Sequence, residues 1–348
     1  SFMNNPNYLD YYIAFMNGEG QYPLSLALAE ILVYNYYDNY AHSPGVQFSI
    51  PAYGQNLIYN NSNNTVLAPA QSQKNRGKLT GRKVKVLKGS NAQLTDWETE
   101  TFFYDHYGNL IQTHVVNAFG GIDRLSTQFN FSGQPVRSVA ALDNSLCLSK
   151  PNTAVVKSFN YSTRTGHLES VEQKIDNSSQ WRTLATYAYD ELGRIQSKNI
   201  GGNIERQDYT YSVRGQLQGI NQIYAETGNK NGQAKTFGES LKYDYGFTDV
   251  KYDGNVAGMI WKGSGTYPSQ AYGYSYDEAG RLTKADYSEY SVDNLNPNGP
   301  ILHWNRTSSD YSTSEISYDL DGNITNMTQM GVANVVVNNV ATPQVVVM

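Results

Sequence analysis

The stretch YAYDELGRI, Tyr187–Ile195, decides the fold, because close variants of it return three more times along the chain. The variants are FFYDHYGNL, YSYDEAGRL and ISYDLDGNI, at residues 102–110, 274–282 and 316–324. A chain that repeats a phrase is usually built as an array of equivalent structural units. We therefore expect the repeat to form a scaffold, and we assign it before any single residue.

Each copy predicts one β-hairpin. Side chains alternate along a strand, so Tyr187 and Tyr189 project from the same face. Asp190 is a residue type that starts a turn, and Gly193 can adopt the left-handed conformation that a short hairpin loop needs. The repeat residues with these duties are Tyr104, Asp105, Gly108, Tyr189, Asp190, Gly193, Tyr276, Asp277, Gly280, Tyr318, Asp319 and Gly322.

Weaker copies extend the array. Those at residues 129–133, 159–168 and 209–217 keep the aromatic and the glycine but lose the aspartate, and a shortened copy stands at 252–256. We expect a β-rich part at 1–90, with a short helical turn at Leu24–Glu30 and a polar loop at 57–72. The array itself would cover 91–330, with loop insertions at about 227–239 and 293–310, followed by a β-prone tail at 331–348.

Composition excludes several classes of function. The formal net charge is −5, so no basic field is present to attract nucleic acid. Cys147 is the only cysteine, which excludes an intrachain disulfide and a cysteine-based zinc site. No apolar run approaches the ~20 residues of a membrane helix, so we expect no membrane insertion within this segment. The 29 tyrosines and 30 glycines favour strands joined by tight turns.

Candidate chemistry is weak throughout. Asp96, Glu98 and Glu100 share a strand face, yet a glycosidase needs two carboxylates on opposite sides of a cleft. Asp319 and Asp321 resemble the start of a calcium loop, but the glutamate that would complete it is missing. The histidines show no metal-ligand spacing, the paired glycines precede no helix, and no nucleophile elbow is found. We expect no catalytic residue, cofactor or metal, and hence no enzyme.

The tryptophans are the remaining candidates for ligand contact. Trp97, Trp181, Trp261 and Trp304 lie outside the repeat positions and could stack on a sugar or anchor a protein partner. The other interpretation is that they pack in the core, as aromatic residues of a repeat array usually do.

The motif Y-D-x-x-G-[NR]-[LI] resembles the YD, or RHS, repeat of large exported or cell-surface bacterial proteins, and is more distantly similar to toxin-complex shell proteins and teneurins. The resemblance covers about Phe102–Met330. It implies an all-β array of antiparallel hairpins in a curved or spiral sheet, part of a shell around the protein's own C-terminal region. The family's self-cleavage cannot be carried over, because the chain contains no Asp-Pro dipeptide. We expect the chain to be an internal piece.

Two functions follow from this interpretation. The first is a non-enzymatic structural segment of a secreted or cell-surface RHS-repeat protein, which encloses or presents a C-terminal effector region. Its partner would be the remainder of its own polypeptide. The alternative is a surface binding module for carbohydrate or a protein on the concave face of the sheet. A wall segment should pack its repeat tyrosines, whereas a binding module should expose a contiguous aromatic patch.

Overall fold

The structure is a computed structural model. It describes residues 32–50, 56–57, 66–87, 95–143, 152–176, 178–265, 268–293, 301–306, 309–337 and 340–347. The chain forms two compact units, Ser1–Arg182 and Thr183–Met348. Their boundary falls inside the segment 91–330 expected to hold the array. The expected helical turn at Leu24–Glu30, Cys147 and part of the expected loop at 57–72 lie outside the described residues.

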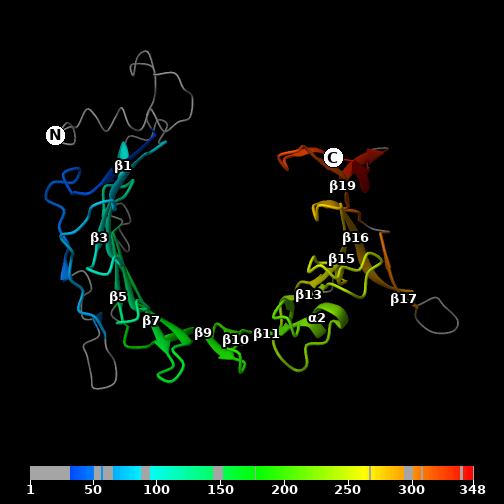
Figure 1. Cartoon of the computed structure of the whole chain (residues 1–348), viewed down its shortest axis with the longest axis horizontal. Coiled ribbons are helices and arrows are strands. Elements are labelled where there is room, and N and C mark those ends of the chain that lie inside the picture. The colour runs from blue at the N-terminus through cyan, green and yellow to red at the C-terminus, as the bar shows by residue number, and fades with distance from the viewer. Residues whose placement is uncertain are drawn as a thin grey trace, which may run out of the picture. The chain divides into compact units, whose positions relative to one another are not determined.

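The first unit is an antiparallel sheet in which each strand pairs with the next one in sequence (Figure 1). Its strands are β1 (Val33–Tyr37), β2 (Leu79–Lys85), β3 (Trp97–Tyr104), β4 (Leu110–Val116), β5 (Ile122–Phe129), β6 (Pro135–Asp143), β7 (Asn152–Tyr161) and β8 (Leu168–Ile175). This consecutive pairing is the order that hairpin repeats dictate.

The second unit continues the same plan with one short helix, α2 (Gln222–Thr227). Its strands are β9 (Arg182–Tyr189), β10 (Ile195–Ile200), β11 (Glu205–Tyr211), β12 (Leu217–Ile220), β13 (Gly238–Lys242), β14 (Gly258–Lys262), β15 (Gln270–Tyr276), β16 (Leu282–Asp293), β17 (Ile301–Asn305), β18 (Thr313–Tyr318), β19 (Ile324–Val337) and β20 (Val340–Val347). Strand β16 pairs with both β17 and β18. The prediction of an all-β array of antiparallel hairpins is confirmed.

One row across the first unit shows where its core lies. Phe103, Gln112, Ser126, Val139 and Val156 are cross-strand partners from β3 to β7, and none is more than 3% exposed. The row contains polar as well as apolar side chains, because the segment that packs over it presents backbone N–H and C=O groups. Such groups need hydrogen-bond partners when they are buried. That segment is a stretch without regular strands, residues 40–49, which we call the covering segment.

The covering segment attaches to the sheet by rings and by backbone bonds. Tyr40 stacks on Phe103 with ring centroids 5.1 Å apart, and its hydroxyl donates to the Phe102 carbonyl oxygen at 3.0 Å. The His42 imidazole lies against Gly81 so closely that a Cβ at that position would overlap the ring. A glycine inside a strand often marks such a close approach.

Three details differ from the sequence-based expectations. The loop expected at 227–239 begins with the last residue of helix α2 and ends in strand β13, and no helix was expected there. The loop expected at 293–310 contains strand β17. In two of the weaker copies another side chain takes over the hydrogen bond that the aspartate makes in the full motif. Asn130 Oδ1 and Ser212 Oγ accept from the backbone N–H of Gln134 at 2.9 Å and of Gln216 at 3.2 Å.

Candidate functional site

The repeat turn is a polar constellation that recurs along the described part of the chain, and Asp277 shows its geometry. Its Oδ1 accepts hydrogen bonds from the backbone N–H of Ala279 at 3.0 Å and of Arg281 at 2.8 Å. Gly280 has a φ of 76°, a left-handed conformation that costs glycine little. Tyr276 pairs with Leu282 and Ser275 with Lys284, so the returning strand holds one extra residue and the turn ends in a β-bulge. Asp277 therefore organises the turn with its carboxylate.

The last polar residue of the motif closes the turn from the other side. Arg281 Nε donates to Asp277 Oδ2 at 2.8 Å, and Arg194 Nε donates to Asp190 Oδ2 at 2.7 Å. Where the motif has asparagine, the same bond comes from its amide: Asn109 Nδ2 to Asp105 Oδ2 and Asn323 Nδ2 to Asp319 Oδ2, both at 2.9 Å. The motif therefore has Asn or Arg at this position because both side chains can donate a hydrogen bond to Oδ2 of the aspartate.

These contacts act on the ionisation of the aspartates. Backbone and side-chain hydrogen bonds from Arg281 lower the pKa of Asp277. Hydrogen bonds from the side chain and backbone of Asn323 lower the pKa of Asp319. A carboxylate held ionised by donors within its own turn is a structural acceptor and not a proton donor for catalysis.

The repeat tyrosines join successive hairpins. Tyr276 Oη donates to the carbonyl oxygen of Val256 at 2.8 Å, just before strand β14. Tyr104 Oη likewise donates at 2.7 Å to the carbonyl oxygen of Leu79, the first residue of β2. The same bond is made by Tyr161 to Pro135, Tyr211 to Ile195, Tyr243 to Leu217 and Tyr318 to Leu282. Tyr189 ends strand β9, and burial raises its pKa.

The arginine side chain of one repeat turn also packs over the tyrosine ring of the next copy. The guanidinium of Arg194 lies 4.6 Å from the centre of the Tyr211 ring, and that of Arg281 lies 4.7 Å from the Tyr318 ring. Arg281 Nη1 further donates to the carbonyl oxygen of Asp319 at 3.4 Å. In the second unit, these contacts link a repeat turn to the next copy of the repeat.

Each of the predicted ligand-contact tryptophans packs against aromatic or cationic side chains of its own unit. Trp97 packs on Tyr34 beneath Lys85, and Trp181 lies beneath Arg137 and Lys174. Trp261 stacks on Tyr272 with centroids 5.3 Å apart. Trp304, at 39% exposure, is the most open of the four and packs on Tyr290.

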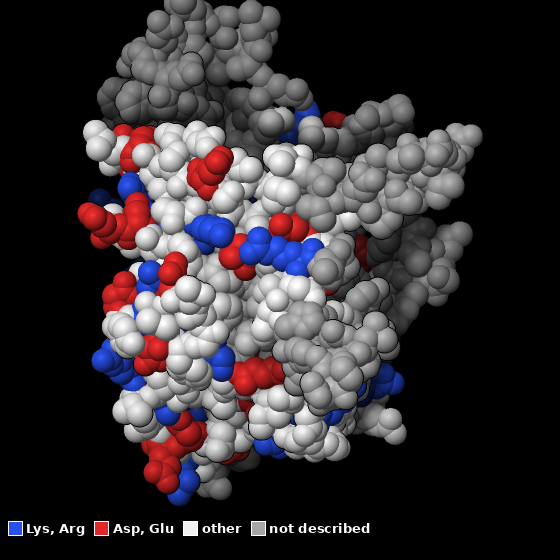
Figure 2. Space-filling model, turned by 90° about the vertical axis from the view of Figure 1, so that its right-hand side faces the viewer, with Lys and Arg blue, Asp and Glu red and all other residues white. Residues whose placement is uncertain are grey.

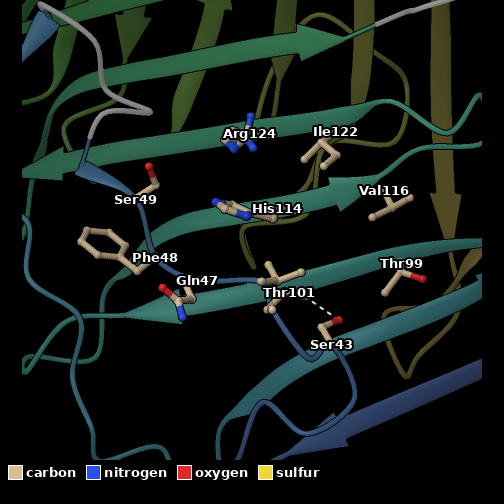
Figure 3. A pocket seen from close by; sticks show the side chains of 12 residues that line it. Ser43, Gln47, Phe48, Ser49, Thr99, Thr101, His114, Val116, Ile122 and Arg124 are labelled. Carbon is tan, nitrogen blue, oxygen red and sulfur yellow. Dashed lines mark hydrogen bonds between the residues drawn. The ribbon is translucent and has the colours of Figure 1, made fainter.

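A hollow of about 330 Å³ lies between the covering segment and the sheet of the first unit (Figure 3). Figure 3 shows His114 and Arg124 side by side on neighbouring strands, where they are cross-strand partners. The hydroxyl of Thr101 donates to Ser43 Oγ at 3.1 Å. The lining residues are Ser43, Gly45, Val46, Gln47, Phe48, Ser49, Thr99, Thr101, His114, Val116, Ile122 and Arg124.

Hydrogen bonds fix the tautomer of His114. Gln112 donates its Nε2 to the carbonyl oxygen of Ser49 and to Ser126 Oγ, both at 2.9 Å, so its Oε1 is the acceptor. His114 Nε2 lies 2.9 Å from that Oε1 and must therefore carry the proton. Burial, helped by the charge of Arg124, lowers the pKa of His114 to about 4. The imidazole is neutral at pH 7, and Nδ1 is left as an acceptor.

A second hollow, of about 430 Å³, lies in the second unit beside Trp304. Two of its cations share one carboxylate: Arg306 Nη2 and Lys284 Nζ lie 2.6 and 3.2 Å from Asp286 Oδ1. Asp249 Oδ2 accepts the hydroxyl of Ser275 at 2.6 Å. The charged side chains that line this hollow therefore each have a partner in its own wall.

Two carboxylates considered for catalysis or calcium binding have partners of their own. Glu100 forms an ion pair with Arg82 at 2.6 Å, while both oxygens of Asp319 serve its own turn. Within the described ranges no cluster of three His, Cys, Asp or Glu side chains could hold a metal. In the same part of the chain no helix is long and apolar enough to cross a membrane. Acidic and basic side chains are interspersed on the face in Figure 2.

Sequence reasoning missed the hollow beneath the covering segment. The spacing of the histidines indicates no metal site, and the sequence pattern gives Arg124 no role. The signal that brings the two together is strand register, which pairs Thr101 with His114 and His114 with Arg124. Alternation along β4 and β5 could have placed both on one face.

No protein-family model and no curated protein matches this chain. Among solved structures it is similar to the TcdB2–TccC3 crystal structure without the hypervariable C-terminal region, with a TM-score of 0.39 and 13% identity over 79% of this chain. It is also similar to the Photorhabdus luminescens Tc holotoxin pore, with a TM-score of 0.26 and 14% identity over 77% of this chain. The matches span 14% and 15% of those chains. TM-scores below 0.5 establish neither a family nor a function here.

Proposed function

We propose that this chain is a non-enzymatic structural segment of a large secreted or cell-surface protein of the RHS-repeat type. It would build part of a β-shell that encloses or presents a C-terminal effector region. The observation that carries the proposal is the tyrosine bond between hairpins, as from Tyr318 Oη to the Leu282 carbonyl oxygen at 2.7 Å. A motif residue that binds the preceding hairpin builds a continuous wall.

The other motif residues support the same role. Asp277 and Arg281 satisfy each other within their turn, and Arg281 then contacts Tyr318 of the next copy. The side chains of Tyr276, Asp277 and Arg281 therefore each have a structural partner. An enzyme or a ligand site built on the motif would instead need groups that remain available to a substrate.

The test is electron cryomicroscopy of the complete gene product that contains this chain, together with limited proteolysis. The expected result is a hollow shell with residues 33–347 in its wall and a C-terminal region protected from protease until the wall is opened. Finding these residues in an open, solvent-accessible domain, with the C-terminal region cleaved at once, would contradict the proposal. Turnover of a glycan or peptide by this chain would contradict its non-enzymatic part.

A surface binding module is the second candidate, and the position of Trp304 favours it. This side chain is 39% exposed and lies at a hollow in the second unit. Carbohydrate or a surface protein would be the partner. A glycan array with the purified chain and with Trp304→Ala tests it. Saturable binding that the variant loses supports the module, and binding that the variant retains excludes this tryptophan as the contact.

A further inference from the structure

The hollow beneath the covering segment has an unusual charge balance. Among the described residues that line it, Arg124 is the only one charged at neutral pH, and none is Asp or Glu. The structure gives Arg124 no ion pair with any described residue. An arginine that lines a concave site without a carboxylate partner is suited to bind an anionic ligand, and its planar fork matches a carboxylate in particular.

Beside this cation stands a neutral acceptor. His114 is 6% exposed, and its Nε2 proton is committed to Gln112 Oε1 at 2.9 Å. The contacts of the described residues give Nδ1 no hydrogen-bond partner. Because His114 lines the hollow, Nδ1 can accept a hydrogen bond from a ligand hydroxyl. A donor for a carboxylate and an acceptor for a hydroxyl therefore lie on adjacent strands.

The rest of the lining fits a sugar-sized molecule. Thr101 donates to Ser43 Oγ, which leaves the Ser43 hydroxyl proton for a further acceptor. Phe48, Val116 and Ile122 supply apolar surface for the C–H face of a ring. The volume of about 330 Å³ is at the small end of the range for small-molecule sites.

We propose that this hollow binds a hydroxylated carboxylate of monosaccharide size, a sugar acid, with the carboxylate on Arg124 and a hydroxyl on His114 Nδ1. The site lies within the first unit and does not depend on the shell role. It can exist in a wall segment as well as in a binding module.

The test is calorimetric titration of the purified chain with D-glucuronate, D-glucose and acetate. D-Glucose has the same ring without the carboxylate, and acetate has the carboxylate without the ring. The expected result is saturable binding of glucuronate, with acetate and glucose each at least about tenfold weaker, as expected when a charged hydrogen bond or the ring contacts are lost. Equal binding of glucuronate and acetate, or no binding of glucuronate, would overturn the proposal.

The variants Arg124→Gln and Arg164→Gln provide a matched pair. Both remove one positive charge, but Arg164 is exposed in the turn between β7 and β8. Arg124→Gln should weaken glucuronate binding at least about tenfold, whereas Arg164→Gln should leave it unchanged. Equal loss in both would reveal a general charge effect and overturn the site. If Arg124→Gln does not fold, Arg124→Lys keeps the charge without the fork, and its unchanged affinity would overturn the carboxylate contact.

Discussion

The phenol oxygen of Tyr318 lies 2.7 Å from the carbonyl oxygen of Leu282, the first residue of strand β16. The two residues are 36 positions apart and belong to successive copies of the repeat. Tyr318→Phe removes the hydroxyl and leaves the carbonyl without this donor, so we expect a loss of about 1 kcal/mol in the free energy of unfolding. Urea denaturation measures it. Tyr252→Phe, at a 75% exposed tyrosine, is the control and should be neutral.

Removal of a turn carboxylate should make the array less sensitive to acid. Hydrogen bonds from Arg281 lower the pKa of Asp277 in the folded chain, so the folded state binds this proton less readily than the unfolded state. The stabilisation is present above the unfolded pKa of about 3.9 and is lost as the pH falls through the folded pKa. Asp277→Asn should lower the melting temperature at pH 7 and reduce its decline below pH 4. An unchanged acid profile would contradict this role.

His114 predicts a second, separate pH dependence. Burial lowers its pKa to about 4, against about 6.5 in an unfolded chain. Between these values the unfolded state binds more protons, so the free energy of unfolding should fall as the pH decreases from about 6.5 to 4. His114→Gln should flatten that part of the curve. Denaturant midpoints at a series of pH values test it, and an equal slope in both proteins would contradict it.

Gly81 should not tolerate a side chain. A Cβ there would overlap the His42 imidazole, so Gly81→Ala must displace the covering segment from the sheet. We expect faster protease cleavage within residues 40–49 and a lower melting temperature. Gly263→Ala is the control, because its Cβ would meet nothing within 4 Å and the backbone there has no positive φ. Equal protease resistance of the two variants would show that the ring can move aside without cost.

Helix α2 should depend on one carboxylate. Glu226 Oε1 accepts hydrogen bonds from Lys242 Nζ and Ser240 Oγ, both at 2.6 Å, and Lys242 is only 7% exposed. Glu226→Ala leaves a buried ammonium without its counter-ion, and we expect a loss of about 2 to 3 kcal/mol, because the carboxylate is partly solvated. Glu278→Ala, at an exposed turn position, should cost little. Denaturant unfolding measures the free energy of unfolding of both variants, and equal losses would contradict the role of Glu226.

The sequence could predict those parts of the fold that depend on interactions between residues a few positions apart. Asp277 and Arg281 are four positions apart, so their turn follows from local chemistry, as does the hairpin it closes. Helix α2 was missed because its six residues are held by Lys242 and Ser240 from strand β13 rather than by their own propensity.

The candidate site was missed for a related reason. His114 and Arg124 meet only through the register of β4 and β5, and Ser49 reaches Gln112 from 63 positions away. The motif likewise specifies a tyrosine but not the carbonyl group it binds, because that partner belongs to the preceding hairpin. Long-range pairing of this kind leaves no short pattern in the sequence.

The bonds from repeat tyrosines such as Tyr211 and Tyr318 to the hairpin before them give the array a direction. Tyr211 needs the carbonyl group of Ile195, which has already been synthesised when Tyr211 emerges, whereas Ile195 needs nothing from later residues for that bond. During synthesis from the N-terminus, each new hairpin can therefore bind a hairpin that has already folded. The most recent hairpin is then the one whose carbonyl group still lacks its tyrosine donor, and a truncated chain retains the bonds between the hairpins made before it.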